Sequence, residues 1–243
     1  MPMLTGPSHH LYYASLHRRR LWLSHLTEAF EKKAGPDFLA DRKRLDSSFA
    51  RTLRRLSADS HLGIQTPLPL HVVVDDTPID SFLTTLSEEL DAYEHNLFEL
   101  MHKAATEQSW FASLEEVSQL WGRELAHESR IALAKADAPT DLMPEPASRS
   151  LRGLTLMFYS VLQGGDFAWK PLLFRRRTDR EIQYELRACP HRKPGGSLEG
   201  ANLACRLEAM IYRGFAQAFF SDVEFERRSP NAGAYCVDEL TLR

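Results

Sequence analysis

Cysteine is scarce in this chain of 243 residues, which has only Cys189, Cys205 and Cys236, all in its last quarter. A small, odd number of cysteines argues against a disulfide framework, and reduced thiols are typical of cytoplasmic proteins. No run approaches the roughly 20 apolar residues that a membrane-spanning helix needs. The first ten residues lack a basic start followed by an apolar stretch, so they predict no secretory signal. We therefore expect a cytoplasmic protein without a membrane span.

Internal repeats, low-complexity segments and a phosphate-binding loop are also missing from the sequence. The glycines in residues 195–200 lack the strand–loop–helix setting and the lysine of a phosphate-binding motif. The arginine clusters at 18–20 and 51–55 are not interleaved with aromatic residues, and the chain is slightly acidic, with a pI of about 6.4. These features disfavour a nucleic-acid partner and predict solvated helix faces.

Charge is unevenly distributed, although the net charge is only −3. Residues 1–60 carry a net charge of +5, residues 61–147 carry −12, and residues 148–243 carry +4. Two interpretations follow from this pattern. The basic segment 1–60 packs against the acidic segment 61–147, or its basic helices bind an anionic partner.

Helical periodicity dominates the first two thirds of the chain. The expected helices span residues 11–33, 36–56, 78–104, 113–135 and 148–163. The short break at Gly35 and Pro36 predicts that the first two form an antiparallel hairpin. Three prolines and three acids in residues 136–146 mark the best candidate boundary, between a helical region 1–140 and a unit 141–243, which we expect to pack together.

Two local patterns refine the middle helices. In the third helix, Glu94 falls with other acids on the face opposite the apolar stripe, and its pairing with His95 is interpreted as a chance neighbour. Ser113 and Glu116 form a capping-box pattern, which predicts the start of the fourth helix.

After residue 165 the hydrophobic period changes from 3.6 to 2, which is typical of strands. Expected strands cover 172–177, 182–188, 223–227 and 235–242, with a helix at 203–220 between the two pairs. The fold class is therefore α+β: N-terminal helices followed by a small antiparallel sheet with one crossing helix. That helix is apolar on two sides, so we expect both sides to be covered. Its own sheet can cover one side. The other side must be covered by the N-terminal helices, a second subunit or an apolar ligand.

Cys189 and His191 form the pair that best fits an enzyme. Basic neighbours, Arg192 and Lys193 among them, would favour a thiolate at Cys189, with His191 as its base. Arg192 and Lys193 also lie just before the crossing helix, where a helix N-terminus can hold an acidic ligand. The alternative is a cysteine that only packs in a basic loop. A zinc site is the third interpretation of the thiols, although only Cys189 and His191 have the close spacing usual for zinc ligands.

The stretch Tyr184–Arg243 resembles the 4-vinyl-reductase-type ligand-binding domain of bacterial sensors, which is related in fold to TRAPP subunits. The resemblance lies in the helix end 214–219 (GFAQAF), the strand 223–226 (VEFE) and the strand opening 233–236 (GAYC). It implies a homodimer that binds a small, largely apolar molecule. Some members bind zinc, and by position Cys205, Glu226 and Cys236 match three of its ligands. The fourth, a cysteine expected near Arg228, is absent, so Cys189 or His191 would have to replace it.

The leading hypothesis is a small-molecule-binding or sensory protein with an apolar pocket beside the crossing helix, lined by Tyr212 and Phe219. The alternatives are a small-substrate enzyme that uses Cys189 and His191, and an interaction adaptor that binds a partner protein through the apolar helix surface.

Overall fold

A computed structural model describes residues 6–59, 79–105, 107, 109–135, 150–151, 154, 172–186, 191, 198–228 and 236–243. Its elements confirm the α+β class. The helices and strands are α1 (Gly6–Glu31), α2 (Pro36–Asp59), α3 (Ile79–Ala104), α4 (Ser109–Lys135), β1 (Leu172–Arg177), β2 (Glu181–Leu186), α6 (Leu198–Phe219), β3 (Val223–Arg228) and β4 (Cys236–Leu242). The expected boundary at 136–146 and most of the expected helix at 148–163 lie outside these residues.

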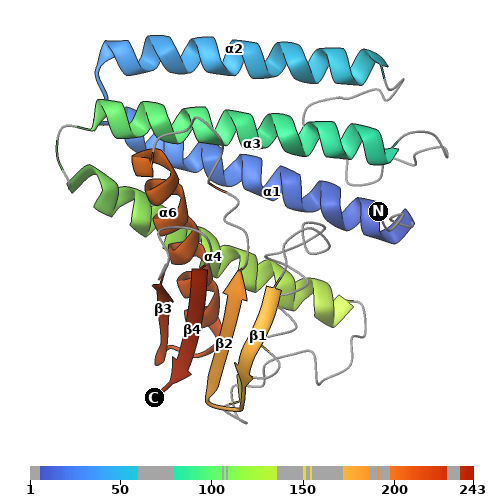
Figure 1. Ribbon diagram of the computed structural model, residues 1–243, viewed down its shortest axis with the longest axis vertical. Helices are drawn as coiled ribbons and strands as arrows, with labels where there is room; N and C mark the ends of the chain where they lie inside the picture. The colour runs from blue at the N-terminus through green and yellow to red at the C-terminus, as the bar shows by residue number, and fades with distance from the viewer. Residues whose placement is uncertain are drawn as a thin grey trace.

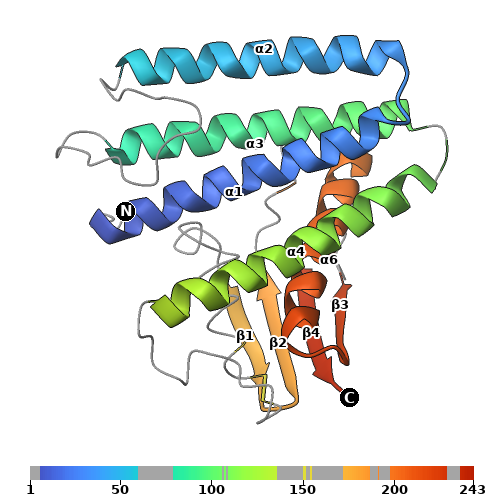
Figure 2. The same ribbon diagram turned by 180° about the vertical axis from the view of Figure 1, so that it is seen from behind.

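The N-terminal helices form a stack (Figures 1 and 2). α2 runs back in the opposite direction to α1, as the hairpin prediction required, but it packs mainly on α3, which lies between them. α1 in turn packs against both α3 and α4. Their shared core contains fully buried side chains from all three helices: Leu23, Leu26, Phe30, Leu97, Phe98, Met101 and Leu114. Within the described part of the chain, no helix combines the length and the apolar character needed to cross a membrane.

The sheet is antiparallel, with strand order β1-β2-β4-β3. Alternation along β4 buries every second residue, from Cys236 through Asp238 to Leu242. The strand register places Tyr184 opposite Asp238 and Asp238 opposite Arg227, so these three polar residues form one row on the inner face of the sheet. α6 packs on this face.

The second apolar face of α6 is covered by α4, so the first of the three expected alternatives holds (Figure 2). The two helices approach closely at a pair of glycines. A β-carbon added at Gly214 would lie 1.9 Å from the Gln119 carbonyl oxygen, and one added at Gly122 would lie 2.1 Å from the Ile211 carbonyl oxygen. Beside this crossing, Gln119 Nε2 donates a hydrogen bond of 2.8 Å to Gln217 Oε1. Packing within the chain therefore explains why α6 is apolar on two sides.

Two helix starts differ from the sequence prediction. α4 begins at Ser109, so the capping-box interpretation of Ser113 was wrong: this residue lies inside the helix, and its hydroxyl donates to the Trp110 carbonyl at 2.8 Å. The earlier start brings Trp110 against Phe30, with ring centroids 5.3 Å apart. α6 begins at Leu198, five residues before the expected start; its added first turn contains buried Gly200 and Ala201, and α6 packs against α3.

Candidate functional site

Acidic residues of α3 hold an arginine of α1 at the boundary between the helical stack and α6. Arg19 contacts Asp91 at 2.6 Å and Glu94 at 2.5 Å. The Glu94 side chain is only 4% exposed, which corrects the expectation that it lies on the solvated face. Burial by itself would raise the pKa of Glu94, but the positive charges of Arg19 and His191 outweigh burial and lower that pKa to about 2.

His191, in the segment before α6, lies between two carboxylates. Its Nδ1 is 3.1 Å from Glu94 Oε1, and its Nε2 is 3.3 Å from Glu208 Oε2 on α6. Burial by itself would lower the pKa of His191, but Glu208 and Glu94 outweigh it and raise that pKa to about 9. His191 is therefore an imidazolium at neutral pH, and both of its nitrogens donate to carboxylates.

Arg227 of β3 continues this series of contacts into the sheet. It donates to Glu208 at 2.8 Å and makes a two-pronged contact with Asp238, with both hydrogen bonds at 2.7 Å. Its guanidinium also lies 5.1 Å from the centroid of the Tyr212 ring. Asp238 is fully buried, at 0% exposure, so Arg227 supplies the positive charge that this carboxylate needs inside the protein.

We call this series the buried ion chain; its members are Arg19, Glu94, His191, Glu208, Arg227 and Asp238. Positive and negative groups alternate along it, so each charged group lies next to a group of opposite charge. The chain runs from α1 and α3 through His191 to α6, β3 and β4. It therefore ties the N-terminal helices to the sheet by polar contacts, beside the apolar contact of α4 with α6.

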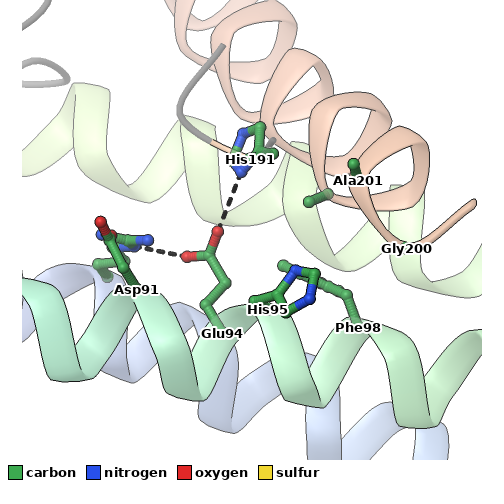
Figure 3. A pocket seen from close by; sticks show the side chains of 9 residues that line it. Asp91, Glu94, His95, Phe98, His191, Gly200 and Ala201 are labelled. Carbon is green, nitrogen blue, oxygen red and sulfur yellow. Dashed lines mark hydrogen bonds and ion pairs between the residues drawn. The ribbon is translucent and has the colours of Figure 1, made fainter. Parts of the chain in front are cut away.

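A pocket opens beside the first half of the buried ion chain (Figure 3). Its cavity volume is about 10 Å³, within about 240 Å³ of empty space that includes open solvent. Its lining combines charged and polar side chains with the first turns of α6, and consists of Arg19, Asp91, Glu94, His95, Phe98, His191, Gly200, Ala201 and Ala204. Figure 3 shows Glu94 rising from α3 toward His191, with His95 and Phe98 on the same helix. The lining carries both signs of charge, and no large apolar surface.

The enzyme hypothesis paired Cys189 with His191, and only His191 is among the described residues; Arg192 and Lys193 also lie outside them. Because both ring nitrogens of His191 donate to carboxylates, neither is placed to accept a proton from a thiol. His191 is thus part of an ion network, and its geometry gives no support to the role of general base.

The zinc hypothesis named Cys205, Glu226 and Cys236, and the structure brings together only the two cysteines. Contact with Cys236, together with burial, raises the pKa of the Cys205 thiol. Glu226 is exposed on the other face of β3, where it pairs with Arg228 at 2.6 Å. The Arg227 guanidinium lies 3.8 Å from Cys205 Sγ, so a cationic side chain already occupies this position. Among the described residues no group of three His, Cys, Asp or Glu side chains is placed to hold a metal ion, so these residues do not fit zinc.

Tyr212 and Phe219, the expected pocket residues, are both buried by the protein itself. Tyr212 packs against Phe225 and Arg227, whereas Phe219 packs against Phe215 and Arg130. The pocket described above lies near the other end of α6, so the expected location beside these two aromatic residues does not match it.

Most of the ion chain was missed from sequence, although weak signals were present. Glu94 lies four residues after Leu90 and three before Leu97, which are both buried, so it falls within the helical stripe. Asp238 occupies the inward position between Cys236 and Leu240 in the alternation of β4. A charged residue at a core position predicts a buried ion pair, but its spacing does not identify the partner.

Comparison with known proteins adds no relative: no protein-family model, no curated protein and no solved structure matches this chain.

The buried ion chain predicts a stability that depends on pH. The folded pKa of His191 is about 9, above the unfolded value of about 6.5. Its contribution is therefore fully present below about pH 6.5 and is lost as the pH rises through about 9. Urea unfolding from pH 6 to pH 10 should show this fall, and His191→Gln should flatten it. An equally steep fall in H191Q would assign the dependence to another group.

Proposed function

We propose that this protein binds a small polar molecule in the pocket between α1, α3 and the first turns of α6. The main support for this proposal is that an open pocket lies beside buried side chains that are charged and ion-paired. Sites that bind small molecules are concave and contain a few convergent polar groups, often with perturbed pKa values. Glu94 and His191 are such groups.

The size and lining of the pocket favour one class of ligand. Its cavity volume, about 10 Å³, is about that of one water molecule and far below the roughly 300 Å³ at which pockets for drug-sized ligands begin, so a bound molecule would lie largely in the open mouth of the pocket. The lining carries the Arg19 guanidinium beside the carboxylates of Asp91 and Glu94. A bound molecule must leave these groups hydrogen-bonded, because an unsatisfied buried polar group costs about 1–3 kcal/mol. We therefore propose a ligand of a few heavy atoms with both donors and acceptors, such as a small zwitterion.

This proposal keeps the class of function that the sequence suggested but changes the chemistry of the ligand. The resemblance of Tyr184–Arg243 to the 4-vinyl-reductase-type domain supports a ligand-binding role and implies a small, largely apolar ligand, and the sequence prediction placed the pocket beside Tyr212 and Phe219. The packing of Tyr212 against Arg227 and Phe225 favours the polar pocket instead. The homodimer, the sensory role and the cytoplasmic location stay predictions from the sequence.

Glycine, acetate and ethylammonium test the proposal as a matched set of zwitterion, anion and cation. In backbone amide NMR spectra of the whole chain, glycine should shift the signals of Gly200, Ala201 and Ala204 in a saturable way. Acetate and ethylammonium should shift them less at equal concentration. His95→Ala removes a polar lining group outside the ion chain and should weaken glycine binding several-fold.

His127→Ala is the control, because His127 is an exposed histidine of α4 that does not line the pocket. This variant should bind glycine as the unchanged protein does. Equal responses to all three probes, or none, would refute a polar site for a zwitterion. Saturable shifts at Tyr212 and Phe219 with an apolar probe would favour the apolar pocket that the sequence predicted beside the crossing helix.

A further inference from the structure

The outer face of α2 carries a dense group of basic side chains, which we call the basic face of α2. It consists of Lys43, Arg44, Arg51, Arg54 and Arg55, all of them exposed. Small residues fill the other exposed positions between residues 43 and 55, namely Ser47, Ser48 and Ala50. This stretch presents no exposed acidic or large apolar side chain to solvent.

The two interpretations of the basic N-terminal segment apply to different helices. On α1, Arg19 pairs with Asp91 and Glu94, and Arg18 lies 3.8 Å from Glu128. α1 therefore packs against the acidic segment 61–147. On α2, Arg42 also faces inward, where it contacts Glu31 and Asp46. These arginines account for the charge that is neutralised within the protein.

The outward residues of α2 are neutralised far less. Among the described residues, the ion pair found for them is that of Arg44 with Asp41, at 3.1 Å, and both side chains of this pair are well exposed. Such surface pairs contribute little, about 0–1 kcal/mol. Positive charge therefore accumulates on the face that points away from the rest of the molecule.

The arrangement of these charges is regular. At about 100° per residue, the five side chains fall within an arc of about 120°. Lys43 and Arg54 lie along one edge of this arc, and Arg44, Arg51 and Arg55 lie toward the other. From Lys43 to Arg54 the helix rises about 17 Å. Because α2 is the outermost helix of the stack (Figures 1 and 2), the basic face forms a ridge with a positive row on each side.

We infer that the basic face of α2 binds the phosphate backbone of duplex DNA, without reading the base sequence. A helix is about 10–12 Å across, which matches the major groove of about 12 Å, and its two basic rows would face the two phosphate strands. The absence of exposed aromatic and large apolar residues between residues 43 and 55 favours this partner over a membrane, where such residues insert. Whole-chain pI and the lack of interleaved aromatic residues argued against a nucleic-acid partner. The pI averages over the whole chain, however, and stacking aromatic residues are a feature of single-strand binding, whereas contacts to a duplex backbone need only basic groups.

Fluorescence anisotropy of a labelled 20-base-pair DNA duplex, titrated with the whole chain, tests this inference. Each phosphate contact contributes about −0.9 to the slope of log K against log salt. Five contacts give a slope of about −4.5, so binding should weaken roughly 500-fold between 50 and 200 mM salt. The double variant Arg51→Gln/Arg55→Gln should reduce the slope by about 2 and weaken binding at 50 mM salt at least tenfold.

Arg176→Gln/Arg228→Gln is the matched control, since it removes the same charge from exposed arginines of the sheet. This control should retain the slope. Equal weakening by both double variants would show that only net charge matters and would overturn the inference. It would also be overturned by the absence of binding at 50 mM salt with 100 μM protein, or by binding to phosphatidylserine vesicles in place of the duplex.

Discussion

Arg227→Ala should lower the free energy of unfolding by about 4 kcal/mol, because breaking a buried ion pair from one side costs about 3–5 kcal/mol. Arg227 is 7% exposed and neutralises two carboxylates, those of Asp238 and Glu208. Without it, Asp238 is left as a charge with no solvent contact. Urea unfolding at pH 7, followed by circular dichroism, measures the loss.

Arg228→Ala is the matched control, because it removes the next arginine of the same strand. Arg228 lies on the opposite face of β3, more than half exposed, and pairs with exposed Glu226. Its loss should cost less than about 1 kcal/mol. Similar losses in the two variants would contradict the buried ion chain, because Arg227 is buried within it and its neighbour Arg228 is exposed outside it.

Gly214→Ala should also destabilise the protein, by about 3 kcal/mol, the upper part of the usual range for overpacking. A β-carbon at this position would lie 1.9 Å from the Gln119 carbonyl oxygen and 2.8 Å from its carbon. Because these atoms belong to the backbone of α4, relief requires α4 and α6 to move apart, which weakens the packing around the crossing. Thermal and urea unfolding of the purified variant measure the effect.

Packing and helix propensity predict opposite effects of Gly214→Ala on stability. In a helix interior, alanine is favoured over glycine by about 1 kcal/mol, so propensity alone predicts that Gly214→Ala stabilises the protein. Gly35→Ala is the control, because an added β-carbon there meets nothing within 4 Å; it should change stability by less than about 1 kcal/mol. A stable Gly214→Ala variant would mean that α4 does not cover α6 as described.

The elements of the fold could be predicted from the sequence because their signals are local. Helical stripes and strand alternation extend over a few turns or residues, so the bounds of α2, β1 and β3 agree closely with expectation. The helix starts at Ser109 and Leu198 were missed because distant packing, such as that of Trp110 on Phe30, extends these helices beyond their local capping signals.

The candidate site could not be predicted in the same way, because its contacts join distant parts of the chain. Arg19 and Glu94 are 75 residues apart, and Glu94 and His191 are 97 residues apart. The sequence singled out His191 for its neighbour Cys189, whereas the structure gives it two carboxylate partners from other elements. Burial of a charge depends on such partners, and the spacing of residues along one helix carries no information about them.

The central claim is that His191 is held as a buried imidazolium between Glu94 and Glu208, beside the pocket. The most direct measurement is the ¹⁵N NMR spectrum of its ring, assigned by comparison with H191Q and recorded from pH 5 to pH 10. We predict that both ring nitrogens carry protons at pH 7.5 and that the ring titrates near pH 9. A neutral ring at pH 7.5, with a midpoint near 6.5, would contradict the account.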